Sequence, residues 1–445
     1  MSGHSEPAPG PGLTGLTWDH PRAYRPLAAY ARLGRGPAVR WDRQSLEDFE
    51  AHPIAELARR YDLLIVDHPG LGAALAAGAL RPLAEVADAA TVAGWRAASV
   101  AATWRSYELD GEAWAVPVDA ATQVMVLRPD LVPRPPRSWP EVVELAGRVP
   151  VTLCLGGPHA LLGLLGMCAS AGGAGPRPTP GGAGPRSWAP AGAGPQSTPG
   201  GAGPQSTPGG AVPQSTPAGA GPQSAPGGAE EHLLAPAVAV AAIETLRAVW
   251  ARSDRRYGLG NPIQVHEAMA GGEVALCPLA YGYASYARPV PGAHALRWAD
   301  APTFGTDRPG GVLGGTGLAV SARSGADPDE VRAWLSGYLD PAVQAGLVPD
   351  SGGQPATTAA WDRPEVDAAW GGYYSSTRRS LEAAHLRPRI NGWISLQDKA
   401  SELVREAVTA GADAARTVAA INDHYRALTG TLISSEARRA RERAV

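Results

Sequence analysis

The tripeptide Asp-His-Pro occurs twice in the sequence, and each copy follows a short apolar segment. Each copy therefore stands where a predicted β-strand ends. If the two strands are parallel neighbours, both copies lie at one edge of a sheet, where ligands commonly bind. Imidazole and carboxylate groups could hold a divalent metal there, but the same tripeptide forms ordinary turns, and we favour a turn or a ligand contact over a metal site. The residues concerned are Asp19, His20, Asp67 and His68.

Other candidate residues combine a polar group with an aromatic face or lie where the backbone is open. Trp18 could stack on a ligand, and carboxylate or amide side chains could bond its hydroxyl groups. The further candidates are Asp119, Gln123, Tyr281, Tyr283, Gly315, Thr316 and Trp361. Each has a structural alternative, as a strand-edge polar pair, a core ring or a glycine turn. If Asp119 contacts the ligand, its replacement by Ala would weaken binding without unfolding the protein.

The order of predicted elements indicates an α/β fold. From Gly15 to Pro82, short strands alternate with helices of crossover length, a pattern typical of a largely parallel sheet. The sequence further predicts a hairpin turning at Asp110–Gly111, a helix that begins after Ser138, and two short strands around a turn in GGVLGGTGLAVSA. Apolar spacing predicts an amphipathic helix over 331–339 and a single final helix over 396–428.

A nonapeptide close to GGAGPQSTP recurs between residues 171 and 229. It offers no apolar side chains to bury, so it cannot offset the entropy of ordering. We expect a disordered insertion there, a disordered N-terminus over 1–14 and a tail over 431–445.

Length and composition limit the function. A chain of 445 residues is long enough for two lobes, and a formal net charge of −3 gives no basic field for nucleic acid. The sequence has 13 Trp and 12 Tyr but 2 Phe, which suits stacking on a polar ligand. The three cysteines show no metal-ligand spacing, and we expect reduced, buried thiols.

The first 21 residues show neither the basic segment nor the apolar segment of a signal peptide. Taken as written, the sequence predicts a cytoplasmic protein, or an extracytoplasmic one if the true start lies upstream. No apolar run is long enough to insert into a membrane.

Motifs of common enzyme classes are missing from the sequence. It has no phosphate-binding glycine loop, no His-Glu-x-x-His and no Gly-x-Ser-x-Gly. The run Asp350-Ser351-Gly352-Gly353 is similar to a serine protease motif, but no matching histidine motif precedes it. We therefore expect no cofactor and no catalysis.

Several segments, in order along the chain, resemble the family 1 extracellular solute-binding proteins of ABC importers, which have the type II periplasmic-binding fold. These segments are IVDHPGLGAALAAGALRPL, LDGEAWAVPVDAATQVMVLRPDL, PRSWPEVVELA, EAMAGGEVALCPLAYGY and GGTGLAVSARS. Together they cover most of residues 15–365 outside the repeats.

The resemblance implies two α/β lobes with a ligand cleft between them, a helical C-terminal region and hinges near 116–119 and 278–283. Lobe 1 is expected to comprise 15–115 and 285–318, and lobe 2 to comprise 116–170, 230–284 and 319–430. The implied function is reversible binding of a small polar ligand by hinge closure, sugar-like first and a quaternary amine second. The chain is then a monomer, with an ABC transporter permease as its partner.

Two alternatives stay open. One is a cytoplasmic enzyme or ligand sensor on the same fold that uses the two Asp-His-Pro loops. The other is an interaction protein whose repeat segment recruits a partner.

Overall fold

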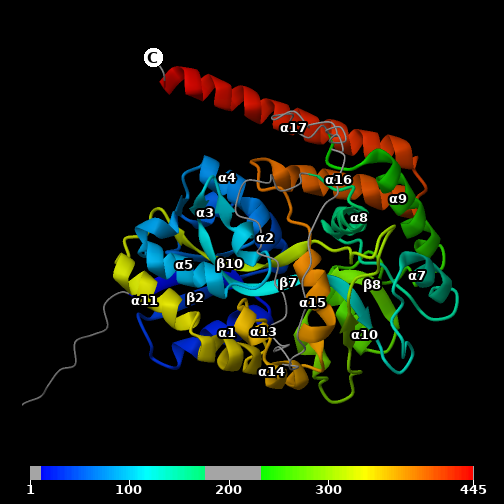
Figure 1. The fold of residues 1–445 in the computed structure, drawn as a ribbon, viewed down its shortest axis with the longest axis horizontal. Helices are drawn as coiled ribbons and strands as arrows, with labels where there is room; N and C mark the ends of the chain where they lie inside the picture. Colours follow the sequence, from blue (N-terminus) through cyan, green and yellow to red (C-terminus); the bar gives the residue numbers. More distant parts are fainter. Residues whose placement is uncertain (1–11, 176–231, 444–445) are drawn as a thin grey trace, which may run out of the picture.

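A computed structural model describes residues 12–175 and 232–443 of the protein (Figure 1). Most of the repeat segment and the first 11 residues, where disorder is expected, lie outside the described residues. The strands are β1 (Leu13–Trp18), β2 (Val39–Gln44), β3 (Leu63–Val66), β4 (Leu80–Arg81), β5 (Glu108–Leu109), β6 (Glu112–Ala113), β7 (Ala115–Leu127), β8 (Leu276–Tyr281), β9 (Arg297–Ala299) and β10 (Leu313–Ser321).

The α-helices separate and cover these strands. They are α1 (Pro21–Ala31), α2 (Leu46–Ala51), α3 (Ile54–Leu57), α4 (Leu71–Ala76), α5 (Ala89–Ala98), α6 (Thr103–Ser106), α7 (Trp139–Leu145), α8 (His159–Ser170), α9 (Pro236–Trp250), α10 (Pro262–Ala270), α11 (Pro328–Tyr338), α12 (Val348–Asp350), α13 (Thr358–Trp361), α14 (Pro364–Ala369), α15 (Tyr373–Ala383), α16 (Trp393–Thr409) and α17 (Ala414–Arg443). Short 3-10 turns occur at His68–Gly70, Leu83–Glu85 and Ala284–Ala287, and a π-helical turn occurs at Val343–Leu347.

One mixed sheet runs through the molecule in the order β2-β1-β3-β10-β7-β8. Strands β2, β1 and β3 are parallel, whereas β10 is antiparallel to both β3 and β7. The predicted parallel α/β unit at the start of the chain is therefore confirmed. All four residues of β3 are buried, as expected for a strand that is covered on both faces.

Strand β7 connects the two ends of this sheet. Its first part, Ala115 to Thr122, pairs with β10, and its second part, Gln123 to Leu127, pairs with β8 and β9. All 13 residues of β7 are buried. In Figure 1, β7 and β10 lie between the blue segments of the first lobe and the green segments of the second. The strand thus crosses from one lobe into the other.

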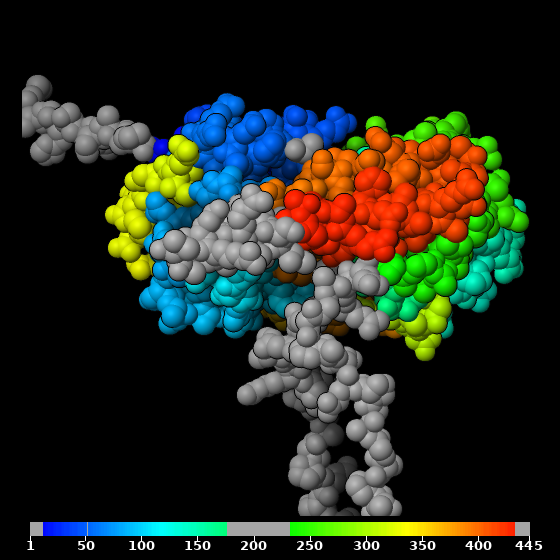
Figure 2. Space-filling view, turned by 90° about the horizontal axis from the view of Figure 1, so that it is seen from above, coloured from blue at the N-terminus to red at the C-terminus, as the bar shows by residue number. Residues whose placement is uncertain are grey.

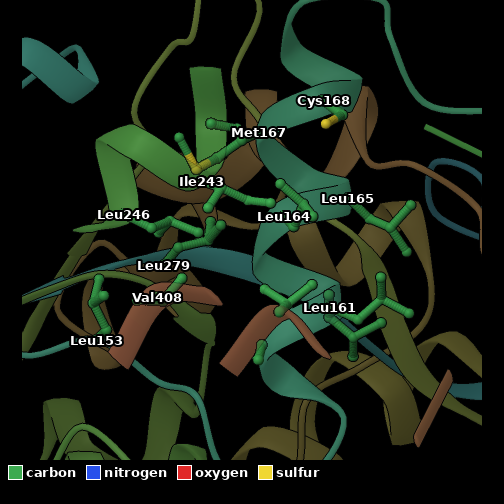
Figure 3. Close-up of a cluster of buried hydrophobic side chains, with 14 of the residues drawn as sticks. Leu153, Leu161, Leu164, Leu165, Met167, Cys168, Ile243, Leu246, Leu279 and Val408 are labelled. Atoms are coloured by element: carbon green, nitrogen blue, oxygen red, sulfur yellow. The ribbon is translucent and has the colours of Figure 1, made fainter. Parts of the chain in front are cut away.

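The two lobes have separate apolar cores. In the first lobe, Leu27, Leu63 and Val116 share a cluster with Trp334. In the second, helix α8 is almost entirely buried, and Figure 3 shows its leucines packed against Ile243, Leu246 and Val408 from α9 and α16. Figure 2 shows green segments at one end of the molecule and yellow segments, next to blue N-terminal ones, at the other.

The packing differs from the expected division into lobes. Helix α11 confirms the predicted amphipathic helix, but its buried face, including Val331 and Trp334, packs in the first lobe. Residues Leu296 and Trp298 pack instead with the second-lobe residues Val265 and Met269. Sequence order alone does not determine these positions, because the chain crosses between the lobes several times. We therefore propose that the segment over 285–301 belongs to lobe 2 and that over 319–348 to lobe 1.

Of three further elements predicted from the sequence, the structure confirms one and contradicts two. The hairpin at Asp110–Gly111 is confirmed, since β5 pairs with β6 and both turn residues have positive φ. The predicted single final helix is wrong: it is divided into α16 and α17 at Gly411, whose φ is +80°, and Asp413 accepts a hydrogen bond from Arg416 N at the start of α17.

The predicted pair of short strands in GGVLGGTGLAVSA is also wrong, because the segment forms one strand, β10, with a register shift between Thr316 and Gly317. At the two chain ends, β1 begins at Leu13, inside the expected disordered segment, and α17 continues through the expected tail to Arg443.

The three cysteines are free and buried, as predicted. No helix in the described part of the chain has the length and apolar character needed to span a membrane.

Candidate functional site

A cavity of about 60 Å³ lies where the two lobes and the crossing strands meet. Its lining combines aromatic rings with polar and ionisable groups. The lining residues are Trp18, Arg22, Leu46, Phe49, Glu50, Asp67, Ala121, His159, Pro262, Tyr281, Tyr283, Gly314, Gly315, Thr316 and Arg387. The first lobe supplies those up to Asp67, and the second supplies His159 to Tyr283.

The first-lobe wall of the cavity is aromatic. Trp18 is the last residue of β1, and its ring lies 5.0 Å from the ring of Phe49, which follows on the short helix α2. Ser45 caps that helix by accepting a hydrogen bond of 3.0 Å from Asp48 N. The end of a buried strand and a capped helix together place two apolar faces at the cavity.

Strand β10 forms a second wall through a stretch of close backbone approach. Gly315 has φ of +89°, and a Cβ atom there would lie 2.3 Å from the carbonyl oxygen of Asp119. A Cβ atom at Gly314 would lie 2.5 Å from the ring of Tyr281. Both positions therefore require glycine, and the register shift that follows places Thr316 at the cavity.

Arg22 and Asp119 form a buried ion pair beside the cavity. The guanidinium Nε donates to Asp119 Oδ2 at 2.7 Å, a second nitrogen donates to Asp119 Oδ1, and Nη1 donates to the carbonyl oxygen of Gly282 at 3.0 Å. The same guanidinium lies 4.7 Å from the ring centroid of Tyr283. Arg22 on α1 is thereby bound to the crossing strand and to the second lobe at once.

Asp67 and Arg387 form a second ion pair. Arg387 Nη2 donates to both carboxylate oxygens of Asp67 at 2.8 Å. Burial is the largest single influence and would raise the pKa of Asp67, but the charge and hydrogen bonds of Arg387 together with the neighbouring His68 outweigh it and hold the pKa at about 2. The loop between α15 and α16 thus contributes a residue to the cavity that lies 320 positions from its partner.

Glu50 and His159 face each other across the cavity, with Glu50 Oε1 and His159 Nε2 3.8 Å apart. Burial, followed by the charge of Asp67, raises the pKa of Glu50 to about 8. Burial, followed by the charge of Arg387, lowers the pKa of His159 to about 3. Both side chains are therefore uncharged at neutral pH in this arrangement.

Four buried residues around the cavity have polar atoms without a hydrogen-bond partner among the described residues. Buried polar groups are normally paired, so each such atom requires an explanation. The atoms are Trp18 Nε1, Thr316 Oγ1, Arg387 Nε and both ring nitrogens of His159. Their side chains are between 2% and 4% exposed. Unpaired buried polar atoms that surround a cavity are available to bind a polar ligand.

The structure brings six of the residues singled out from the sequence to this cavity. They are Trp18, Asp67, Tyr281, Tyr283, Gly315 and Thr316. Asp119 lies behind them in its ion pair with Arg22. The other five do not line the cavity.

Those five have other surroundings. Asp19 is exposed and pairs with Arg43, and His20 lines an outer groove of about 1020 Å³. His68 is fully buried beside Tyr107. The remaining two, Gln123 and Trp361, are buried within the fold, where Gln123 accepts a hydrogen bond from Val312 N and the Trp361 indole donates to the carbonyl oxygen of Pro355.

The strands that end in the two Asp-His-Pro motifs are parallel neighbours, so the condition stated for a shared sheet edge is met. The two motifs nevertheless face different surroundings: His20 packs on Tyr283, and His68 packs on Tyr107. Within residues 12–175 and 232–443, no group of three or more His, Cys, Asp or Glu side chains could hold a metal ion.

Sequence inspection did not identify Arg22, Phe49, Glu50, His159 and Arg387. Arg22 directly follows the first Asp-His-Pro motif, and His159 follows a Gly-Gly-Pro turn at the start of an apolar helix, so both had a local signal. Glu50 and Arg387 had no local sequence signal, because only the tertiary structure places them at the cavity.

The outer groove is larger than the cavity but has a different character. It is open along α1 and α10 and holds exposed arginines, with Arg43 stacked 3.5 Å from the ring centroid of Tyr24. The small cavity is the better candidate for a ligand site because buried, unpaired polar atoms surround it.

Comparison with solved structures shows the same fold. The maltose-bound MalE3 protein of Thermotoga maritima has a TM-score of 0.70 at 16% identity, with 94% of this chain and 99% of that chain covered. A solute-binding protein of an ABC transporter from Agrobacterium radiobacter, in complex with ribitol, has a TM-score of 0.69 at 14% identity, with 94% and 99% covered.

The GacH receptor of Streptomyces glaucescens, solved without ligand and with acarbose, has a TM-score of 0.67 at 15% identity, with 94% of this chain and 97% of that chain covered. A comparison with curated protein sequences gave no match.

A family model matches the chain over more than half of its length. Residues 36–371 match the bacterial extracellular solute-binding protein model. The family and the similar solved proteins bind solutes and are not enzymes. The chain therefore belongs to the bacterial extracellular solute-binding protein family, with the two-lobed fold of ABC-transporter binding proteins.

Proposed function

We propose that the protein binds a neutral, hydroxyl-rich ligand, sugar-like in chemistry, in the cavity between its lobes. The observation that supports this most directly is the set of buried polar atoms without partners at Trp18, Thr316, His159 and Arg387. A ligand hydroxyl both donates and accepts hydrogen bonds, so it can satisfy indole, hydroxyl, imidazole and guanidinium groups alike.

The charges at the cavity favour a neutral ligand. Arg22 is neutralised by Asp119 and Arg387 by Asp67, while Glu50 carries a proton at neutral pH. An ionic ligand would therefore lose its hydration without gaining an opposite charge that is free to pair with it. The rings of Trp18 and Phe49 supply the apolar surface on which the carbon face of a sugar can stack.

The volume supports binding by closure of the lobes. Sites for small organic ligands usually occupy about 300–1,000 Å³, whereas this cavity measures about 60 Å³. A sugar-sized ligand therefore requires the lobes to separate before it enters, and the arrangement described here is a closed one. Bending along β7 and β10, which cross between the lobes, provides such a motion.

The similar solved proteins agree with a sugar-like ligand. They were solved with maltose, ribitol and acarbose, all of which carry many hydroxyl groups. We further propose an ABC transporter permease as the partner and a monomeric binding protein as the acting species. Membership of an extracellular solute-binding family supports a site of action outside the cytoplasm.

Binding is tested by calorimetric titration and thermal shift of the purified chain with maltose, ribitol, acarbose, carnitine and an amino acid panel. A ligand that binds only the folded state raises its melting temperature. We expect a response to at least one hydroxyl-rich ligand. A response to carnitine alone would replace the sugar-like ligand by a quaternary amine bound by the aromatic rings, and a well-folded sample with no response would reject the proposal.

A further inference from the structure

Glu50 and His159 come from opposite lobes and face each other at the cavity between them. Glu50 lies near the end of α2, in the first lobe, and His159 is the first residue of α8, in the second. Their closest atoms are 3.8 Å apart, which is too long for a hydrogen bond. The two side chains therefore face each other without bonding to each other.

Their spacing suits one shared hydroxyl group. An oxygen atom about 2.8 Å from each of two atoms can bond both when those atoms are 3.8 Å apart. Both groups line the same cavity, and both ring nitrogens of His159 have no other partner among the described residues. A ligand hydroxyl placed between them would be bound by both lobes at once.

The groups that face Glu50 leave it without a cation. Arg387 and Asp67 both lie near Glu50. The charge of Arg387 is already paired with the carboxylate of Asp67, so it is not free to pair with Glu50. Asp398 on α16 and Glu47 on α2 add negative charge nearby. The phenols of Tyr281 and Tyr283 have raised pKa values because they are buried, so they stay protonated.

We propose that Glu50 and His159 bind one ligand hydroxyl between the lobes, and that closure of the lobes binds a proton at Glu50, so that ligand affinity falls as pH rises above neutrality. This inference rests on the proposed function. It adds a specificity-determining pair to the cavity and a pH range in which that pair operates.

The direction in which ligand affinity changes with pH follows from the number of protons that the open and the closed protein bind. In the closed arrangement the pKa of Glu50 is about 8, whereas an exposed glutamate titrates near 4.5. Between these values the open protein is ionised at Glu50 and the closed protein is protonated, so closing takes up a proton. His159, with an ordinary pKa of 6.5 and a pKa of about 3 here, releases a proton on closing only below 6.5.

The usable range is therefore between about pH 6.5 and pH 8, where only Glu50 changes its charge. Asp67, with a pKa of about 2, stays ionised throughout this range. Affinity is expected to fall by up to about tenfold per pH unit in this range and to become constant above it, where both states are ionised.

The probe is maltose, titrated by calorimetry at about pH 6.5 and about pH 8. We expect the dissociation constant of the unmodified protein to rise up to about thirtyfold between these two values. Glu50→Gln keeps the size and hydrogen bonding of the protonated acid, so its dissociation constant should not change with pH. Glu56→Gln on α3, whose side chain is 63% exposed, is the matched control and should behave like the unmodified protein.

The shared hydroxyl is tested by His159→Leu, which should weaken maltose binding about tenfold at pH 6.5, and by His159→Gln, which keeps hydrogen-bonding groups and should restore part of it. Maltose binding that does not change with pH, or an unaffected His159→Leu variant, overturns the inference and leaves the proposed function intact.

If neither maltose nor any other ligand of the panel binds, the proposed function fails and the shared hydroxyl fails with it, and the melting temperature then tests only the proton at Glu50 in the closed arrangement described here. A group whose pKa is raised in the folded state loses its contribution to stability as pH rises through that pKa. The melting temperature of the unmodified protein should then fall relative to Glu50→Gln between about pH 6.5 and pH 8. Parallel curves for the two proteins overturn the binding of a proton at Glu50 in the closed arrangement.

Discussion

Two kinds of polar group meet at the interlobe cavity, and they differ in how they are satisfied. Arg22 and Asp119 hold each other through two hydrogen bonds in a buried ion pair. Trp18 Nε1, at the end of β1, and Thr316 Oγ1, on β10 opposite Asp119, have no partner among the described residues although both side chains are buried. The first kind stabilises the fold, and the second is available to a ligand.

The difference gives opposite expectations for mutation. Removing one member of a buried ion pair leaves an uncompensated charge, which is costly. Removing a buried polar atom that has no partner costs no hydrogen bond within the protein. Loss of stability and loss of ligand affinity should therefore separate at neighbouring residues of one cavity.

The largest effect is expected from Asp119→Ala. Arg22, whose pKa is raised by Asp119 despite its burial, would stay charged and lose its partner. We expect the free energy of unfolding to fall by about 3–5 kcal/mol, measured by urea denaturation. The expectation from sequence, that this variant would lose binding without loss of stability, does not allow for the ion pair.

Asp19→Ala is the matched control for Asp119→Ala. Asp19 also pairs with an arginine, but its side chain is 61% exposed, and exposed ion pairs contribute about 0–1 kcal/mol. Equal losses of stability in the two variants would contradict the distinction between buried and exposed pairs.

The second-largest effect is the loss of stability that we expect when Asp67 is protonated at low pH. Its folded pKa of about 2 lies below the ordinary value of 3.8. A group with a depressed pKa contributes stability that is present above the ordinary value and is lost as pH falls through the folded value, here by about 2 kcal/mol. We expect the unmodified protein to lose about this much relative to Asp67→Asn between pH 5 and pH 2.

The measurement for Asp67 is denaturant unfolding of both proteins across that pH range. Asp62→Asn is a useful comparison, because the pKa of Asp62 is also lowered, by hydrogen bonds from Thr14 and Ser324 rather than by an arginine. A constant difference between the unmodified protein and Asp67→Asn at all pH values would mean that Arg387 and His68 do not hold this carboxylate ionised.

The sequence predicted most of what depends on local pattern. The buried strand β3 and helix α11 could be predicted because apolar spacing reports burial directly, and the hairpin could be predicted because Asp110–Gly111 accepts positive φ. The single final helix failed at Gly411, where one backbone conformation overrides a continuing apolar pattern.

The cavity was only partly predictable, for a physical reason. Residues at strand ends, such as Trp18 and Asp67, can be found because strand topology places them together. Arg387 and Glu50 cannot, because one lies on a loop near the C-terminal end of the chain and the other on a six-residue helix without a motif. Their roles depend on which lobes meet, which no local pattern records.

The smallest effect on stability is expected from Thr316→Val. The hydroxyl is buried and has no partner among the described residues, so replacing it by a methyl group should leave the free energy of unfolding unchanged or raise it slightly. Ligand affinity should fall by about 0.5–1.5 kcal/mol, or about two- to tenfold, if the hydroxyl bonds the ligand. Calorimetric titration with the ligand found in the panel measures this loss.

Thr245→Val on the exposed face of α9, where the hydroxyl donates to Ala241, is the control and should keep full affinity. Unchanged affinity in Thr316→Val would assign its unpaired hydroxyl to the fold and not to the ligand, and the separation between the two kinds of polar group would then have to rest on Trp18 and His159.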